Sequence, residues 1–97
     1  MIVANYEVIT KFAKKHARAR SSLKTWYEVT VKAQWKSFDD VKKTFRTADI
    51  YEDCTIFDIG GNNYRLIASI NYPKQQVYVR AVLTHAEYDK EKWKSDC

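Results

Sequence analysis

The chain of 97 residues has little of what marks several common kinds of functional site. Its only two glycines, Gly60 and Gly61, are adjacent, so no Gly-rich loop is available to hold a nucleotide phosphate. The sequence also has no HExxH motif, no metal-ligand cluster and no serine elbow. We therefore expect neither a metal nor another cofactor.

Cysteine and long apolar runs are also scarce. Cys54 and Cys97 form no metal-binding spacing, and one possible pair is a weak disulfide framework, so we expect reduced thiols as in most cytosolic proteins. The apolar start, residues 1–4, is too short for the core of a signal peptide, and no apolar run could span a bilayer. These absences predict a soluble, cytoplasmic protein with no membrane partner.

Basic residues are plentiful by contrast. The formal net charge is +5 and the pI is about 9.2, which favours a polyanionic partner without choosing among RNA, DNA and acidic protein. No acidic residue lies between Glu7 and Glu28. The basic residues in that gap are Lys11, Lys14, Lys15, Arg18, Arg20 and Lys24.

The length allows one domain, residues 1–97, with a single modest core. Three helices are predicted in its first half, after a short edge strand at Ile2-Val3. Asn5 is expected to cap the first helix, and Ser21 or Ser22 to start the second. Ser37-Phe38-Asp39-Asp40 has the form of a capping box and opens the third. The apolar residues available for packing are Val8, Ile9, Phe12 and Ala13; Leu23, Trp26, Tyr27 and Val31; and Val41 and Phe45.

Strands are predicted from Ala48 onward, where β-branched and aromatic residues dominate. A strand at Asp49 to Tyr51 and a turn at Glu52-Asp53 precede a β-meander. The turns of the meander are Gly61-Asn62 and Tyr72-Pro73-Lys74-Gln75.

The end of the chain is predicted to be helical again. Thr84-His85-Ala86-Glu87 resembles a capping box and indicates a closing helical turn that runs toward Trp93. Helices that precede an antiparallel sheet indicate an α+β fold with the helices on one face.

The two turns set a register for the meander. Asp58 is expected opposite Arg65, and across the second turn Ile67 is expected opposite Arg80. Arg65 would then lie opposite Val82. The face expected to form the core consists of Phe57, Ile59, Tyr64, Leu66, Ala68, Ile70, Val77, Val79, Ala81 and Leu83. The opposite face is expected to present Asp58, Arg65, Ile67, Ser69, Asn71, Tyr78, Arg80, Val82 and Thr84.

In this register Arg65 and Arg80 are diagonal neighbours on the polar face, close enough to hold one phosphate between them. Pro73 favours a type I turn, which often brings a bulge, and a slip of one residue would send one arginine to the other face. Such a slip would bury an arginine among apolar residues, so the hydrophobic pattern opposes it. The alternative role for Arg65 is a surface ion pair with Asp58 across the strand.

Several separated segments resemble the HigB branch of the RelE-type bacterial toxins. They are GGNNYRL, INYP, VYVR and THAEYD, together with Trp35-Lys36-Ser37 and Asp40-Val41-Lys42. The resemblance runs through nearly the whole chain. It implies one RelE-like toxin domain, residues 1–97, in which N-terminal helices pack on one face of a small twisted antiparallel sheet. It also implies a ribosome-dependent endoribonuclease, monomeric when alone, that cuts translated mRNA and is neutralised by a helix-turn-helix antitoxin of the HigA type.

Metal-free RNA cleavage of this kind uses the 2′-hydroxyl of the substrate as nucleophile, which DNA lacks. It needs a base for that oxygen, cations for the charge that grows on the phosphorane, and an acid for the leaving 5′-oxygen. Arg65 and Arg80 suit the cationic role because a guanidinium matches phosphate oxygens. His85 and Tyr88, three residues apart, are the candidates for base and acid, in either order. In the alternative interpretation His85 is structural and Tyr88 covers the core.

Other residues are candidates for binding RNA. Tyr78 either stacks a base or is simply exposed, and Asn62 either shapes its turn or contacts substrate. Lys36 and the neighbouring Trp35 are candidates to join the surface that docks on ribosomal RNA. In the alternative interpretation Trp35 closes the edge of the core. The largest candidate surface is a basic stripe that either docks on ribosomal RNA or is only solvated. It consists of Lys11, Lys14, Lys15 and Arg18.

Two other functions compete with RNA cleavage. One is a non-catalytic toxin of the same fold that binds DNA gyrase, and the other is an RNA-binding module without cleavage. Two arginines on one face, together with His85 and Tyr88, favour the nuclease, because a purely binding surface does not need that combination.

Overall fold

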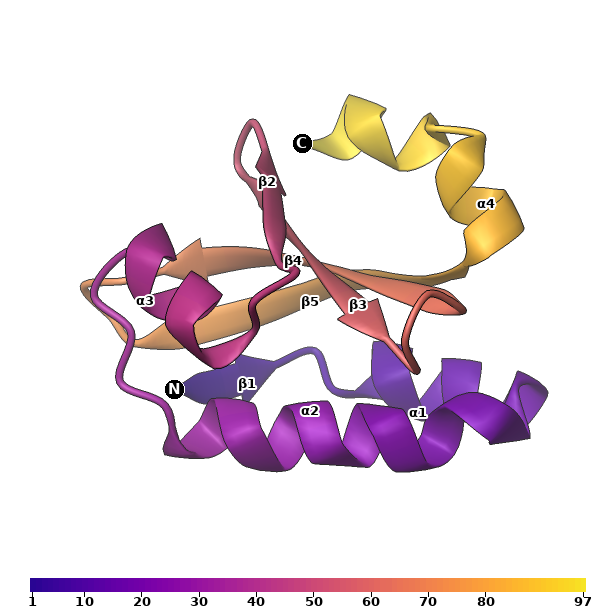
Figure 1. The fold of residues 1–97 in the computed structure, drawn as a ribbon, viewed down its shortest axis with the longest axis horizontal. Coiled ribbons are helices and arrows are strands. Elements are labelled where there is room, and N and C mark those ends of the chain that lie inside the picture. Colours follow the sequence, from indigo (N-terminus) through magenta and orange to yellow (C-terminus); the bar gives the residue numbers. More distant parts are fainter.

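Five strands form one sheet in the order β1-β5-β4-β3-β2 in the computed structural model, which describes all residues 1–97 (Figure 1). The strands are β1 (Ile2–Ala4), β2 (Asp49–Tyr51), β3 (Cys54–Ile59), β4 (Tyr64–Asn71) and β5 (Gln76–Thr84). The helices are α1 (Glu7–Lys15), α2 (Arg20–Lys32), α3 (Phe38–Thr44) and α4 (His85–Asp89), with short 3₁₀ helices η1 (Ala17–Ala19) and η2 (Lys92–Asp96). The predicted α+β fold is confirmed, although β1 runs parallel to β5 and makes the sheet mixed at that edge.

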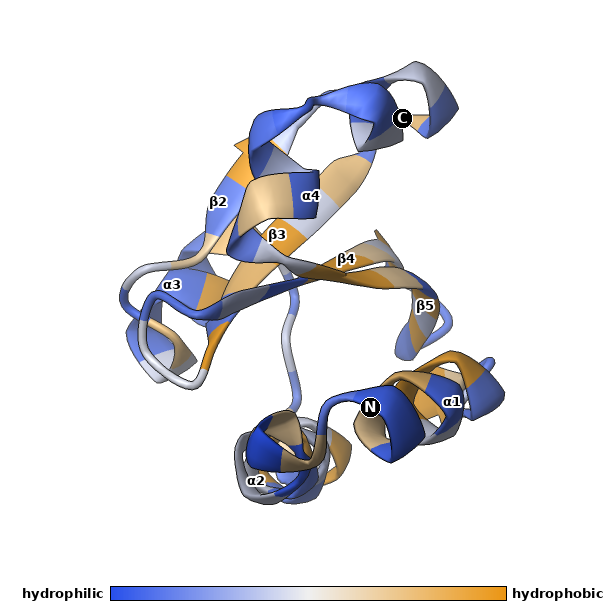
Figure 2. Ribbon diagram, turned by 90° about the vertical axis from the view of Figure 1, so that its right-hand side faces the viewer, coloured by the Kyte–Doolittle hydropathy of each residue, from blue (hydrophilic) through white to orange (hydrophobic).

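The three N-terminal helices cover one face of the sheet, as predicted. Figure 2 shows α1 and α2 side by side against that face. Trp26 of α2 packs edge-on against Phe57 of β3, and Trp35 stacks on the same ring, so Trp35 closes the core rather than facing outward. None of the helices combines the length and apolarity that a membrane crossing requires.

The helix starts differ from the predicted ones in detail. Asn5 does not cap α1: it has a left-handed backbone, with φ of +66°, and its amide nitrogen donates to the Val79 carbonyl at 2.8 Å. This bond ties the chain between β1 and α1 to β5. On α2, Val31 was expected to pack in the core, but it is exposed and Thr30 is buried instead. At α3 the expected capping box is not formed, because the Asp40 carboxylate accepts from the backbone N–H of Lys36.

The register of the meander is confirmed near both turns. Asp58 lies opposite Arg65, and Ser69 opposite Tyr78. Between them a β-bulge interrupts the β4–β5 ladder: Ala68 pairs with Val79, but Ile67 pairs with Ala81. Arg80 is therefore the extra residue of the bulge, and the predicted pairing of Ile67 with Arg80 is wrong.

The bulge exchanges the faces of the residues that follow it. Arg65 pairs with Leu83 rather than Val82, and Val82 is buried in the main core. Ala81 and Leu83, predicted to join that core, pack instead on the opposite face. Arg80 still shares a face with Ser69, to whose hydroxyl it donates a hydrogen bond.

A second, smaller apolar cluster lies on the face opposite α1 and α2. It contains Cys54, Ile56, Ile67 and Trp93, and it is covered by α4 and η2 (Figures 1 and 2). Cys54 is bonded to Cys97 in a disulfide, so the expectation of two reduced thiols is wrong. The two residues are 43 positions apart, and only the fold, by turning the end of the chain back over the sheet, brings their Cα atoms to 5.5 Å.

Candidate functional site

Arg65 is held by a dense set of acceptors at the β3–β4 hairpin. Its Nε lies 3.0 Å from a carboxylate oxygen of Asp58, and its Nη1 donates to the carbonyls of Asn62 and Tyr64 at 3.2 and 3.0 Å. Its Nη2 donates to the side-chain oxygen of Asn62. These bonds engage four of the five N–H groups of the guanidinium. Arg65 is only 8% exposed, so the expected ion pair with Asp58 exists, but it is not a surface pair.

Tyr88 of α4 lies directly beside this arginine. The Arg65 guanidinium carbon is 5.0 Å from the centroid of the Tyr88 ring. On its other side the ring stacks on Trp93, with centroids 5.1 Å apart, and the Trp93 indole N–H donates to the Tyr88 carbonyl at 3.0 Å. Tyr88 is therefore half-buried in a stack of three side chains, and its expected role as a cover over apolar residues also fits.

His85 opens α4 and is more accessible. The Nδ1 atom lies 2.9 Å from a carboxylate oxygen of Asp89, one helical turn away, and the His85 side chain is 44% exposed. With Nδ1 facing the carboxylate, Nε2 is the nitrogen free to exchange a proton. A carboxylate that orients an imidazole in this way is a common feature of acid–base sites.

The position of α4 depends on a capping box, which confirms the predicted one. The Thr84 hydroxyl accepts from the Glu87 backbone N–H at 3.2 Å, and the Glu87 carboxylate accepts from the Thr84 N–H at 2.9 Å. The hydrogen bond from the Thr84 backbone is the main reason that the pKa of Glu87 is lowered. In addition, the His85 N–H donates to the Asn63 carbonyl at 3.1 Å, which ties α4 to the hairpin beside Arg65.

Arg80 lies farther along the sheet, in a pocket of about 360 Å³ lined by Tyr78, Trp93 and Asp96 among others. Its Nη1 donates to the Ser69 hydroxyl at 3.1 Å and its Nη2 to the Asp96 backbone carbonyl at 2.7 Å. Tyr78, 48% exposed, lines the same pocket as this arginine. An exposed aromatic ring next to an arginine suits a nucleotide, whose base can stack while its phosphate binds the guanidinium.

The structure thus sorts the predicted catalytic residues into two groups. Arg65 and Tyr88 are in contact near His85, whereas Arg80 lies in the pocket with Tyr78, and none of the pockets includes both arginines. The predicted diagonal pairing of the two arginines is wrong, because the bulge shifts the register between them. The two guanidinium groups also have different partners, Asp58 for Arg65 and Ser69 for Arg80. Trp93 connects the groups, since it stacks on Tyr88 and lines the Arg80 pocket.

Sequence reasoning missed several partners of these residues. Trp93 was expected only as the end of a helical turn, and Ser69 and Asp96, which hold Arg80, were not singled out. No local pattern could have identified Asp96, because its contact depends on the fold of the whole C-terminal segment. Asp89, by contrast, had a usable signal: it lies four residues after His85 on a short helix.

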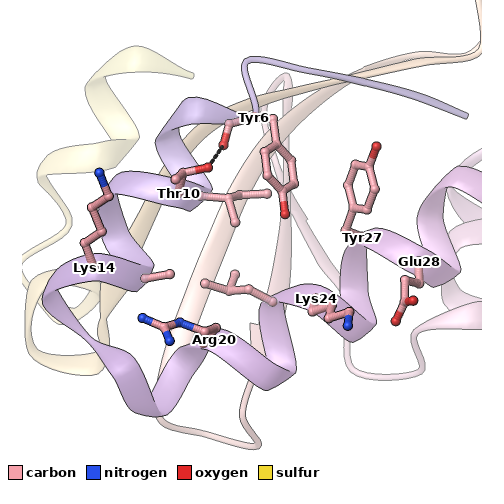
Figure 3. Close-up of a pocket in the computed structure, with 10 residues that line it drawn as sticks. Tyr6, Thr10, Lys14, Arg20, Lys24, Tyr27 and Glu28 are labelled. Atoms are coloured by element: carbon pink, nitrogen blue, oxygen red, sulfur yellow. Dashed lines mark hydrogen bonds between the residues drawn. The ribbon is translucent and has the colours of Figure 1, made fainter.

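The residues of the predicted basic stripe lie on α1 and on η1. Lys11, Lys14, Lys15 and Arg18 are all exposed. Lys14 also borders the largest pocket, about 590 Å³, which lies between α1 and α2 (Figure 3). In Figure 3 the rings of Tyr6 and Tyr27 lie near one end of this pocket. The other charged residues that line it are Arg20, Lys24 and Glu28.

Two further predicted binding residues have different settings. Asn62 accepts hydrogen bonds from Arg65 through both its backbone and side-chain oxygens, so it helps to fix the position of the guanidinium. Lys36 is exposed in the connection between α2 and α3. The structure contains no group of three or more His, Cys, Asp or Glu side chains that could hold a metal ion.

Known proteins resemble this chain over most of its length. A family model described as HigB toxin, the RelE-like toxic component of a toxin–antitoxin system, matches residues 19–91. The mRNA interferase HigB of Escherichia coli O6:H1 (strain CFT073) is 30% identical over 81 residues, which cover 80% of this chain and 79% of that protein. The mRNA interferase toxin HigB of Escherichia coli K12 is 29% identical over 80 residues, or 79% of this chain and 77% of that protein. The protein named mRNA interferase HigB from Shigella flexneri matches with the same values.

Proposed function

The chain belongs to the HigB family of RelE-like toxins, the toxic components of toxin–antitoxin systems, and from this premise we propose that it is a ribosome-dependent endoribonuclease that cuts translated mRNA. The observation that carries the proposal is the match, over about four fifths of the chain, to relatives that are named mRNA interferases. Those names favour RNA cleavage over the binding of DNA gyrase. The arrangement around Arg80 and α4 supports the same conclusion independently.

The cleavage step uses the 2′-hydroxyl of one nucleotide as nucleophile on the adjacent phosphate. A base removes the proton from the 2′-oxygen, the 2′-O–P bond forms, and the P–O5′ bond breaks as an acid protonates the leaving oxygen. The products are a 2′,3′-cyclic phosphate and a 5′-hydroxyl. The enzyme must supply two proton transfers and positive charge at the phosphorane.

Arg80 is the proposed phosphate-binding cation. Its side chain is exposed, and its present partners, a hydroxyl and one backbone carbonyl, are neutral groups that a phosphate can replace. Arg65 fits this role less well, because most of its N–H groups are engaged by Asp58 and the hairpin. Its proposed contribution is to hold Tyr88 in place, with one N–H left for substrate.

His85 and Tyr88 are the proposed proton-transfer residues. Asp89 holds Nδ1 of the partly exposed His85, which leaves Nε2 for proton exchange, as in an oriented base. Tyr88, set between Arg65 and Trp93, has little freedom to move and presents its hydroxyl at a fixed place. Both belong to α4, so the capping box at Thr84 positions the two together.

Contacts with the ribosome and mRNA are proposed for the exposed groups. Tyr78 stacks a base beside the phosphate on Arg80, and Asn62 acts through Arg65. The basic stripe and Lys36 dock on ribosomal RNA by releasing counterions. The partner that neutralises the toxin is proposed to be a helix-turn-helix antitoxin of the HigA type, and the site of action is the cytoplasm, where ribosomes translate.

Primer extension on cellular mRNA after brief expression tests the proposed function. We expect new 5′ ends inside translated codons. The matched control is the same transcript with its start codon removed, which should stay intact because it is not translated. DNA damage with uncut mRNA would favour the gyrase alternative. Growth arrest without RNA cuts or DNA damage would favour the second alternative, an RNA-binding module without cleavage.

A further inference from the structure

The C-terminal strap, residues 92–97, passes over the proposed catalytic face. Its anchor is Trp93, which is buried between Tyr88 and the apolar residues of the second cluster. Beyond Trp93 the strap continues to Asp96 and Cys97, and these last two residues reach Arg80 and Cys54. The family match ends at residue 91, so the role of the strap does not follow from that match.

The strap forms a hydrogen bond with Arg80, the proposed phosphate-binding residue. The Asp96 backbone carbonyl accepts from Nη2 of Arg80 at 2.7 Å, while Nη1 is engaged by Ser69. A phosphate that binds a guanidinium with two oxygens uses Nη2 together with either Nη1 or Nε, so Nη2 of Arg80, the nitrogen bonded to Asp96, is needed in both arrangements. Asp96 also lines the Arg80 pocket, so the strap narrows the space that a phosphate would enter. The strap therefore competes directly with RNA for Arg80.

The disulfide is what fixes the strap in this position. Within the strap the other hydrogen bonds of residues 94–96 are local, from Lys94 to Glu91 and from Ser95 to Lys92. Besides the disulfide, Cys97 accepts a long hydrogen bond from the Asp53 N–H at 3.5 Å and packs on the second apolar cluster, while its other contacts, with Lys94 and Trp93, lie within the strap. Without the bond to Cys54, Asp96 keeps its single hydrogen bond to Arg80. Apart from the Trp93 anchor and the long bond from Asp53, the strap around it keeps only two further non-covalent contacts with other segments. These are Lys94 over the Tyr51 ring at 4.9 Å and the packing of Cys97 on the second cluster.

We propose that the Cys54–Cys97 disulfide is a redox switch that closes the strap over Arg80 when oxidised and frees Arg80 for phosphate when reduced. This inference rests on the proposed function, because it regulates the same site. Disulfides of cytosolic proteins are usually transient and redox-sensing rather than structural, which fits the proposed location. Cys97 is partly exposed while Cys54 is fully buried, so a reductant reaches Cys97 first.

The switching step is a two-electron thiol–disulfide exchange with a dithiol reductant. One thiolate of the reductant attacks the Cys97 sulfur, which forms a mixed disulfide and releases Cys54 as a thiolate that takes up a proton. The second thiol of the reductant then attacks the mixed disulfide. Cys97 leaves as a thiol, and the reductant ends as a cyclic disulfide. Oxidation by the disulfide form of such a carrier reverses the two steps.

Reduction should accelerate RNA cleavage. Removing a competing bond to a charged group gives roughly a tenfold increase in single-turnover cleavage, the lower end of what one such bond contributes. Trp93 stays packed on Tyr88 in both states, so the proton-transfer residues are not disturbed. The released part of the strap is limited to the residues after Trp93.

The test compares the oxidised protein, the same protein reduced with dithiothreitol, and Cys97→Ser, which has no disulfide in either condition. Single-turnover cleavage on programmed ribosomes gives the rate. Titration with inorganic phosphate, followed by the NMR signal of the Arg80 guanidinium, gives a readout that does not need cleavage. Amide hydrogen exchange reports whether residues 95–97 open. Ser95→Ala, an exposed change that keeps both cysteines, is the matched control.

We expect the reduced protein and Cys97→Ser to cleave faster and to bind phosphate at Arg80 more tightly, with faster exchange in residues 95–97. Cys97→Ser should not respond to dithiothreitol, and Ser95→Ala should respond like the wild type. An equal or slower rate after reduction, or unchanged phosphate binding, would overturn the switch. If no form cleaves RNA but reduction still strengthens phosphate binding, the proposed function fails and the switch stands.

Discussion

The guanidinium of Arg65 lies over the ring of Tyr88, 5.0 Å from its centroid, and this contact joins the β3–β4 hairpin to α4. Arg65 is at the same time bonded to Asp58 and Asn62, so the hairpin holds the arginine and the arginine holds the tyrosine. A residue expected to act on the phosphate is thus first of all a structural support of the site. The distinction between Arg65 and Arg80 follows from their surroundings rather than from their residue type.

Replacing Arg65 with Ala should destabilise the fold. The change removes a buried cation and leaves Asp58 and the Asn62 oxygens without their partner, at a cost of about 2–3 kcal/mol after allowance for the partial exposure of Asp58. Urea denaturation measures this difference. The control is Lys74→Ala in the exposed β4–β5 turn, which should change the free energy of unfolding little. A fully stable Arg65→Ala would mean that the network contributes nothing to folding.

Replacing Arg80 with Ala should leave stability nearly unchanged and reduce cleavage. Arg80 is exposed, and its loss removes a charge proposed to stabilise the phosphorane, an effect of roughly 100- to 1,000-fold. Arg80→Lys should also be impaired, because a point charge lacks the two-pronged geometry. Cleavage rates on programmed ribosomes and melting temperatures provide the two measurements. Wild-type cleavage by Arg80→Ala would remove Arg80 from the mechanism.

The meander could be predicted from sequence because its turns have distinctive chemistry. Gly60 and Gly61 both adopt positive φ, and the pairing of Asp58 with Arg65 follows from that turn. The bulge at Arg80 has no such mark, since Val79, Arg80 and Ala81 contain neither Gly nor Pro. A bulge of this kind is selected by packing on both faces, which depends on residues far away in sequence.

The site was predictable in its residue types but not in its contacts. His85 and Tyr88 lie on the helix that the capping box of Thr84 and Glu87 opens, so their common helix could be inferred. The burial of Arg65 and the disulfide of Cys54 depend on how the chain end returns across the sheet. Neither spacing nor composition encodes that return, because it is driven by the packing of Trp93 on the second face.

His85→Ala and Tyr88→Phe test the proton-transfer assignment. If both residues share acid–base work, each change should slow cleavage by roughly 100- to 10,000-fold while ribosome binding survives. Tyr88→Phe is the cleaner change, because it keeps the ring between Arg65 and Trp93 and removes only the hydroxyl. Single-turnover assays decide the point. If one variant cuts at the wild-type rate, that residue has only its structural role.

Neutralising Lys11, Lys14 and Lys15 together with Gln should weaken ribosome binding and flatten its dependence on salt. The three side chains are exposed on α1 and form none of the salt bridges of the structure, so each can release counterions from RNA. Co-sedimentation with ribosomes at several salt concentrations measures the slope. The matched control replaces three exposed basic residues away from α1, Lys32, Arg46 and Lys74, with Gln. An unchanged slope would show that the stripe is only a solvated face.

The capping box of α4 predicts how the site responds to acid. The pKa of Glu87 is lowered chiefly by the hydrogen bond from the Thr84 backbone N–H. A carboxyl group whose pKa is lowered on folding adds stability at pH values above its ordinary pKa of 4.5, and this stability is lost as the pH falls through the lowered value. Because Glu87 is exposed, we expect a small effect, about 0.5 kcal/mol.

Glu87→Gln should therefore be less stable than the wild type at pH 6 to 7, and the two should converge as the pH falls through the lowered pKa of Glu87. Thr84→Ala is the informative counterpart, since it removes the hydroxyl but keeps the backbone donor that lowers the pKa of Glu87. It should cost about 1 kcal/mol at every pH, as the loss of a helix cap does, and largely retain the acid sensitivity. Urea denaturation between pH 3 and 7 measures both variants. A constant difference between Glu87→Gln and the wild type across that range would mean that the charge of Glu87 does not hold α4, and that the hydroxyl of Thr84 alone caps the helix that carries His85 and Tyr88.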